Sequence, residues 1–236
     1  MEKIITPSLP YWRLSAFYFC FFALLGALHP YWSLYLYSKG FTISDIGILL
    51  AMPMATKIIA PNIWGWLADF TGRRLAVIRI GAFLSCIFFL GIFFDQRFWS
   101  IALVMIGYSF FWNAILPQHE VITVSYLEKS PEAYGRIRLW GSIGFIISVL
   151  GGGLWFDTKD IETLPIVGLL LLIGIFIASI FLPKPILYKS NDENFNGFIL
   201  LATRRIVFIF LLVVRSLIWK FALFFLTTFT TAFPID

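Results

Sequence analysis

The sequence predicts an all-α, polytopic membrane protein, and both its composition and its long apolar runs support that fold class. Of the 236 residues, 60% are hydrophobic and only 13% are charged, and the mean hydropathy is +0.88. Soluble domains carry roughly 25% charged residues. The apolar runs are about 20 residues long, which is enough for a helix to cross the hydrocarbon core. They do not alternate with polar residues as barrel strands do, so we expect helices, whose backbone hydrogen bonds are satisfied internally in lipid.

Seven apolar runs are expected to form membrane helices, because short polar or Gly/Pro-containing connections separate most of them. The first run is too long for the core of a signal peptide, and no small-residue cleavage site follows it, so we expect it to be retained. In chain order the runs comprise residues 14–37, 44–67, 75–94, 98–127, 139–155, 164–182 and 206–233.

A polar connection separates the sixth run from the seventh and divides the chain. Residues 183–205 are rich in Lys, Asn, Asp and Glu, whereas both neighbouring runs are strongly apolar. We therefore expect three parts, namely six helices within residues 1–182, a cytoplasmic linker at 183–205 and a seventh helix within 206–236.

The distribution of Lys and Arg predicts the orientation, because the cytoplasmic loops of membrane proteins carry an excess of these residues. If the N-terminus is cytoplasmic, the opposite side holds only Lys39, Arg97 and Lys159. We expect a multi-pass protein in the lipid bilayer of a bacterial inner (plasma) membrane. This topology accounts for the net charge of +5, and nucleic acid is not an expected partner because no basic stripe lies on a soluble surface. The cytoplasmic side holds Lys3, Arg13, Arg73, Arg74, Arg79, Lys129, Arg136, Arg138, Lys184, Lys189, Arg204 and Arg205.

Two ionisable residues stand out in the first and second runs. His29 precedes Pro30 at an expected helix bend and could relay a proton, although a lone histidine is more often a packing residue. Lys57 lies near the middle of the second run, where a charge costs at least a few kcal/mol and needs a partner, a wet cavity or a function. Pro53, Lys57 and Pro61 share one face, which predicts a locally bent helix that lines a cavity. The alternative for Lys57 is a purely structural ion pair.

The fourth run carries the expected counter-charge of Lys57. Asn113, Pro117 and Glu120 share one face of this run, and Glu120 is the carboxylate that we expect Lys57 to meet. A carboxylate held there, partly removed from water, can carry a proton unless a nearby cation keeps it ionised. The alternative is that Glu120 only anchors the helix end at the interface.

The fifth run presents a guanidinium, a hydroxyl and an aromatic ring on one face, from Arg138, Ser142 and Phe145. An arginine can hold a carboxylate through two hydrogen bonds, and an aromatic face can receive a ring or the apolar side of a sugar. Small residues allow membrane helices to approach closely, and we expect that role for the glycines of this run. These glycines are Gly141, Gly144, Gly151, Gly152 and Gly153.

Residues 65–74 read G-x-x-x-D-x-x-G-R-R, formed by Gly65, Asp69, Gly72, Arg73 and Arg74. This pattern resembles the loop between the second and third helices of major facilitator superfamily transporters. The resemblance implies two six-helix halves around a midplane substrate site, so the chain would contain the N-terminal half and one further helix. We expect a close helix contact at the first glycine, a tight turn at the second, and charge contacts that hold one conformation shut. In that superfamily the acidic residue meets a helix end of the opposite half, so the missing C-terminal half is an expected partner.

A second resemblance concerns the fourth and fifth runs. G-R-x-R followed by an aromatic residue, with a glutamate 138 − 120 = 18 positions before the second arginine, resembles lactose permease and related proton symporters. It implies a charge pair of Glu120 with Arg138 at the substrate site, and a substrate that stacks on Phe145. Residues 61–69 and 134–142 are more similar to the phenylpropionate permease branch, which implies proton-coupled transport of small organic acids. Members with such frameworks also carry sugars and nucleosides.

These features lead us to expect a secondary transporter that moves a small organic solute (an aromatic acid, a nucleoside or a sugar) with protons, by alternating access. The proton is the expected coupling ion, and no other cofactor is expected. We expect no enzyme, because the chain lacks a Ser/His/Asp set and a phosphate-binding glycine loop. We expect no metal site either, since Cys20 and Cys86 lie far apart inside spans and read as packing residues.

The end of the chain leaves an alternative open. The chain stops inside or just after its seventh run, which carries Arg215 and Lys220 among phenylalanines. We expect a frameshift or a premature stop after Arg215, with a fragment boundary or a true half-carrier as alternatives. The alternative function is a truncated, transport-inactive membrane protein, either a relic or a scaffold.

Overall fold

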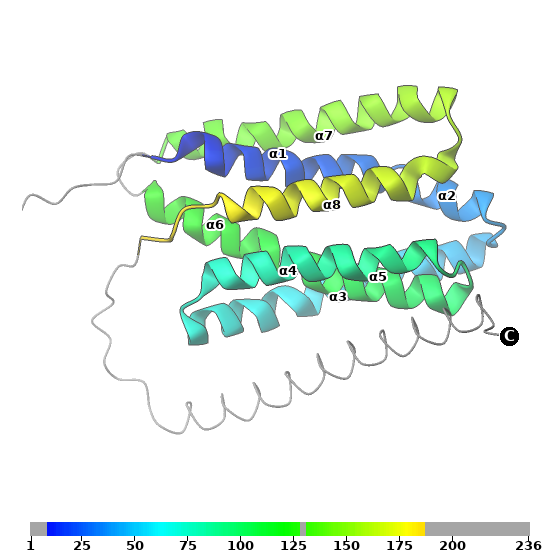
Figure 1. Cartoon of the computed structure of the whole chain (residues 1–236), viewed down its shortest axis with the longest axis horizontal. Coiled ribbons are helices and arrows are strands. Elements are labelled where there is room, and N and C mark those ends of the chain that lie inside the picture. Colours follow the sequence, from blue (N-terminus) through cyan, green and yellow to red (C-terminus); the bar gives the residue numbers. More distant parts are fainter. Residues whose placement is uncertain (1–8, 128–130, 187–236) are drawn as a thin grey trace, which may run out of the picture.

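The computed structural model describes residues 9–127 and 131–186, and within these residues it contains helices and no strand (Figure 1). The expected seventh helix and most of the expected linker lie outside the described residues. The elements are α1 (Tyr11–Leu28), α2 (Trp32–Ser38), α3 (Ile43–Thr71), α4 (Arg74–Phe89), η1 (Leu90–Phe93), α5 (Phe98–Trp112), α6 (Ile115–Tyr126), α7 (Ala133–Thr158), η2 (Ile161–Thr163) and α8 (Leu164–Ile180).

Among the described residues, six helical segments are long and apolar enough to cross a membrane, which matches the six runs predicted within residues 1–182. They are formed by α1, α3, α4 with η1, α5 with α6, α7, and η2 with α8. The first run is interrupted beside Pro30, as expected, because α1 ends at Leu28 and α2 begins at Trp32. The fourth run is also interrupted, at Asn113–Ala114, which the sequence analysis did not anticipate.

The boundaries of α3 follow from local chemistry at both ends. Thr42 and Asp45 form a capping box, in which each side chain accepts a hydrogen bond from the other residue's backbone N–H. Gly72 ends the helix in the left-handed conformation, with φ +64°, which a residue without Cβ adopts at little cost. Between these ends α3 continues through Pro53 and Pro61 without a break.

Two glycines bring α1 and α7 into close contact. A Cβ on Gly26 would lie 2.5 Å from the carbonyl oxygen of Phe145, and a Cβ on Gly144 would lie 2.5 Å from that of Phe19. The backbones of the two helices therefore touch at two levels, as expected for small residues in membrane bundles. α1 also packs on α8, while α4 packs on α5 and α8, and α3 packs mainly on α5.

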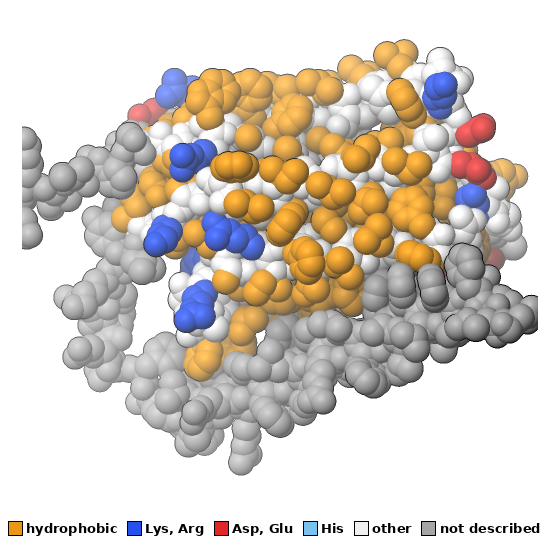
Figure 2. Space-filling model, viewed as in Figure 1, with side chains coloured by type: hydrophobic (Ala, Val, Ile, Leu, Met, Phe, Trp, Pro, Cys, Tyr) orange, Lys and Arg blue, Asp and Glu red, His pale blue; other side chains and the backbone are white. Residues whose placement is uncertain are grey.

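The surface of the bundle matches a protein that spans a bilayer (Figure 2). Apolar side chains cover the middle of the visible face, Lys and Arg gather at one end, and Asp and Glu lie mainly at the other. The end with Lys and Arg, here called the arginine-rich end, contains the α3–α4 turn and the end of α8. The least covered helices are α3 and α7, with only 22% and 11% of their most apolar stretch buried, against 33% to 61% for the other spans.

One ionised group stabilises the turn before α5, at the end opposite the arginine-rich end. The Asp95 carboxylate accepts hydrogen bonds from the Arg97 backbone N–H (3.0 Å), the Arg97 Nε (2.8 Å) and the Ser100 hydroxyl (2.6 Å). Burial acts to raise the pKa of Asp95, but the hydrogen bonds from Arg97 and Ser100 outweigh it and lower this pKa to about 2. Its charge therefore stabilises the fold above about pH 4, the pKa expected in the unfolded chain, and this stabilisation is lost as the pH falls toward 2.

We expect Asp95→Asn to lower the Tm by about 2–4 °C at pH 7, because losing about 1 kcal/mol has that effect in a chain of this size. The Tm is measured by circular dichroism in detergent. Asp157→Asn removes an exposed carboxylate and is the matched control. The difference between wild type and Asp95→Asn should narrow as the pH is lowered from 4 toward 2. A difference that stays constant over this range would contradict the assigned role.

Candidate functional site

The central feature of the candidate site is an ion pair between α6 and α7. Arg138 Nη1 donates to Glu120 Oε1 at 2.7 Å, and the two side chains are 39% and 37% exposed. The ion pair confirms the pairing that the resemblance implied, and its place at a substrate site stays a prediction. The expected pairing of Lys57 with Glu120 is wrong, because Glu120 is engaged by Arg138 and forms no ion pair with Lys57.

Two aromatic rings of α1 complete the surroundings of Arg138. The guanidinium carbon lies 5.5 Å from the ring centre of Tyr18 and 5.3 Å from that of Phe22. A guanidinium over an aromatic face is attracted by the ring electrons. The cation is thus held between a carboxylate and two rings. Sequence reasoning missed both rings, because only the packing of α1 on α7 brings them to Arg138.

Ser142 and Phe145 lie further along α7 than Arg138. Ser142 is exposed, and Phe145 is half-buried, with its backbone against Gly26. Seven residues of helix separate Arg138 from Phe145, or about 10 Å. The two therefore occupy different depths of the bundle.

A second polar cluster joins α3 to α5 and contains Asn113. The Thr56 hydroxyl lies 2.7 Å from the Ser109 hydroxyl, and Asn113 Nδ2 donates to the Thr56 hydroxyl at 3.3 Å. Asn113 was expected at the site, whereas Thr56 and Ser109 were missed. Thr56 directly precedes Lys57, and this position was the only feature of the sequence that pointed to Thr56 as a site residue.

Lys57 and His29 are both exposed, and the charge of Lys57 acts on the His29 imidazole. Within residues 9–127 and 131–186, neither residue forms an ion pair. His119, by contrast, is fully buried and stacks on Phe17 with ring centres 4.3 Å apart. Of these three side chains, His29 and Lys57 are therefore exposed at the surface of the described bundle, and His119 is buried in its core.

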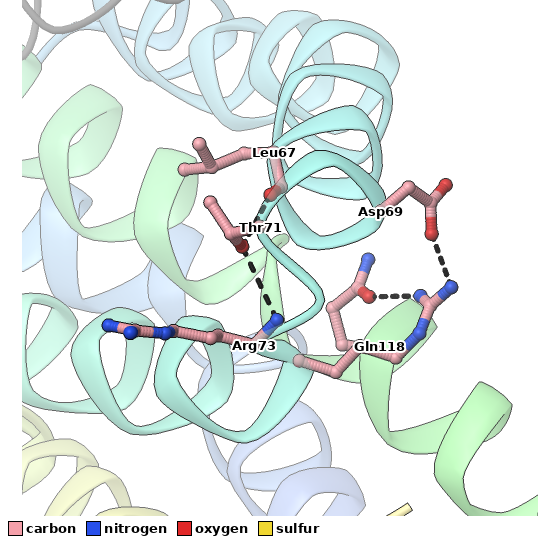
Figure 3. A network of polar contacts seen from close by, with 6 residues as sticks. Leu67, Asp69, Thr71, Arg73 and Gln118 are labelled. Carbon is pink, nitrogen blue, oxygen red and sulfur yellow. Dashed lines mark hydrogen bonds and ion pairs between the residues drawn. The ribbon is translucent and has the colours of Figure 1, made fainter. Parts of the chain in front are cut away.

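The expected gating stretch forms a compact contact at the arginine-rich end (Figure 3). The Arg74 guanidinium bridges the Asp69 carboxylate of α3 and the Gln118 side chain of α6, the latter at 2.7 Å. Gly65 also faces Gln118, since a Cβ there would lie 3.7 Å from its Nε2. These contacts connect the second, third and fourth spans.

Arg73 takes no part in this contact, although we expected both arginines to contribute. Its side chain points away from Asp69 and Gln118, and its backbone N–H lies 3.4 Å from the Thr71 hydroxyl (Figure 3). Gln118 was missed, because a buried amide in the fourth run has no sequence signature of its own. The bridge that we predicted within the loop is therefore completed by a residue from another helix.

Comparison with known proteins decides the family. The family described as MFS_1 like matches residues 11–233, which is nearly the whole chain. The chain belongs to the MFS_1 like family. The match includes the seventh apolar run, in which we expected a frameshift or a premature stop after Arg215.

Several curated members of related transporter families are similar to this MFS_1 like chain. The probable 3-phenylpropionic acid transporter of Escherichia coli (strain K12) is 27% identical over 188 residues, covering 78% of this chain and 50% of the relative. The maltose permease of Geobacillus stearothermophilus is 30% identical over 146 residues, covering 60% of this chain and 36% of the relative. The uncharacterized transporter YwbF of Bacillus subtilis (strain 168) is 26% identical over 144 residues, or 61% of this chain and 36% of the relative. The chain thus spans half or less of the length of these three relatives.

Proposed function

We propose that the protein acts in secondary active transport and moves a small organic solute together with protons across a bacterial inner membrane. Family membership and the names of the relatives support a transporter. The solutes for which two relatives are named, 3-phenylpropionic acid and maltose, support a small organic solute, either an acid or a sugar.

The Glu120–Arg138 pair is the observation that carries the proton-coupling proposal. Ionisable residues within a membrane bundle are costly and mark sites of function. The two side chains of this pair are partly exposed, so a proton or a solute can reach them. A proton that binds the carboxylate cancels its charge and weakens its hold on Arg138, which frees the guanidinium for an acidic or hydroxylated solute. In the reverse step, the Glu120–Arg138 ion pair forms again, and the proton and the solute are released.

The proposed orientation places the arginine-rich end in the cytoplasm. The excess of Lys and Arg at that end supports it. The bridge formed by Asp69, Arg74 and Gln118 would then lie on the cytoplasmic side. We propose that it stabilises the conformation closed to the cytoplasm, together with the remainder of a complete carrier.

We expect membrane vesicles that contain the protein to accumulate a labelled solute only when a proton gradient is imposed. The panel comprises aromatic acids, nucleosides and sugars, each measured with the gradient and after an uncoupler has collapsed it. Vesicles without the protein provide the background. Equal uptake with and without the gradient would contradict the proposed proton coupling. No uptake of any solute would favour the transport-inactive alternative.

A further inference from the structure

We propose that Lys57 binds the anionic group of the transported solute, which makes the substrate class a small organic anion with an apolar body. The inference rests on the proposed function and deepens it. It assigns Lys57 to recognition of the anionic group, in addition to the role proposed above for the Glu120–Arg138 pair.

The position of Lys57 places its charge deep in the membrane. It lies at the centre of α3, with 57 − 43 = 14 residues to one end and 71 − 57 = 14 to the other. At the helical rise this is about 21 Å from either end, which is farther than a lysine side chain reaches toward the interface. An ammonium at that depth needs an anion or water nearby.

No described carboxylate supplies that anion. Four of the described carboxylates, those of Asp69, Asp95, Glu120 and Glu162, are paired with arginine or lysine side chains other than Lys57. The remaining ones lie at helix ends or in connections, far from the middle of α3. These are Asp45, Glu132, Asp157 and Asp160. Lys57 is therefore an uncompensated cation within residues 9–127 and 131–186.

The surroundings of Lys57 indicate the kind of anion that would fit. Met54 lies one turn before it on the same face and is 52% exposed, and the neighbouring Ile58 is 73% exposed. Pro61 has no N–H to pair with the Lys57 carbonyl, so this carbonyl can accept a hydrogen bond from a solute or water. The cation is thus set beside apolar surface and one free acceptor. A carboxylate on a hydrocarbon or aromatic body matches the ammonium and the apolar surface, while water can donate a hydrogen bond to the free carbonyl.

The anion would bind close to the other polar groups of the site. Thr56 is directed to α5, where it meets Ser109 and Asn113, and Lys57 points about 100° away from it around α3. The positive charge of Lys57 also acts on His29 at the end of α1. Lys57 and the Thr56 cluster therefore lie on adjacent sides of α3, and no described carboxylate pairs with Lys57 or His29.

The test compares carboxylates with their own amides, which have the same shape and no charge. The probes are benzoate, phenylacetate and hexanoate with benzamide, phenylacetamide and hexanamide, and binding to the purified full chain in detergent is followed by tryptophan fluorescence. We expect wild type to bind at least one carboxylate about tenfold or more tightly than its amide. Lys57→Met should abolish this preference, and Lys57→Arg should retain it. Lys159→Met removes an exposed lysine at the end of α7 and should leave it unchanged.

The other outcomes overturn the inference in distinguishable ways. If Lys57→Met keeps the preference for carboxylates but lowers the Tm, Lys57 has a structural partner and the inference fails while the proposed function stands. If a neutral sugar or amide binds better than every carboxylate, the substrate class is wrong. If gradient-driven uptake of every solute is also absent from vesicles, the proposed function fails together with the inference.

Discussion

Gly144→Leu is expected to prevent α1 and α7 from packing and to destabilise the bundle by about 3 kcal/mol or more, the upper end of the range for overpacked cores. A side chain at this position meets the backbone carbonyl of Phe19 and not a movable side chain, so the helices themselves must separate. Because α7 carries Arg138 and α1 carries the rings beneath it, their separation also disrupts the candidate site. Fluorescence-detected size-exclusion chromatography after heating measures the loss of folded protein.

The same helix contains a matched control for this substitution. A Cβ on Gly151 would meet no atom within 4 Å, so Gly151→Leu adds the same side chain in open space. We expect its Tm to stay within a few degrees of wild type. Equal melting of Gly144→Leu and Gly151→Leu would show that the close contact between α1 and α7 contributes little to stability.

Glu120→Gln is expected to reduce gradient-driven accumulation to background, because an amide neither takes up the coupled proton nor balances the Arg138 charge. Leaving the guanidinium without its partner should also cost about 1–3 kcal/mol of stability, less than for a fully buried charge. Accumulation is measured in vesicles with an imposed proton gradient, and the Tm is measured on the purified protein. Glu132→Gln removes an exposed carboxylate near the start of α7 and should change neither quantity.

A double substitution separates the structural role of this pair from its proposed coupling role. Glu120→Gln with Arg138→Met removes both charges, so the melting temperature should recover toward that of wild type while accumulation remains at background. If accumulation recovers together with the Tm, the pair acts only through stability. Normal accumulation by Glu120→Gln alone would remove the proposed coupling role.

Local sequence information predicted the six described membrane helices, except for the break within the fourth run. The six spans follow from hydropathy, and the break beside Pro30 follows from proline chemistry. The break at Asn113–Ala114 has no such signature, since neither residue forbids a helix. It places Asn113 where its amide reaches Thr56 on α3, so a tertiary contact accompanies the interruption.

The partners of the charged groups were harder to predict than the helices. The spacing of Glu120 and Arg138, with its resemblance to known symporters, correctly predicted their pairing. The assignment of Glu120 to Lys57 was wrong because it relied only on their opposite charges within the second and fourth runs. Opposite charges inside apolar runs do not show which helices face each other. Gln118 was missed for a similar reason, since its contact with Arg74 depends on where α6 packs.

The sequence by itself determined that this chain is an all-helical membrane protein, that its first six apolar runs form helices long enough to cross a membrane, and which family it resembles. These properties depend on transfer free energies and local backbone chemistry, which are summed along the chain. The tertiary structure alone decided that two rings of α1 lie against the Arg138 guanidinium, and that Lys57 is left without a described counter-charge. Those outcomes depend on which helix faces which, and the close approach of α1 and α7 at Gly26 and Gly144 sets one of these contacts.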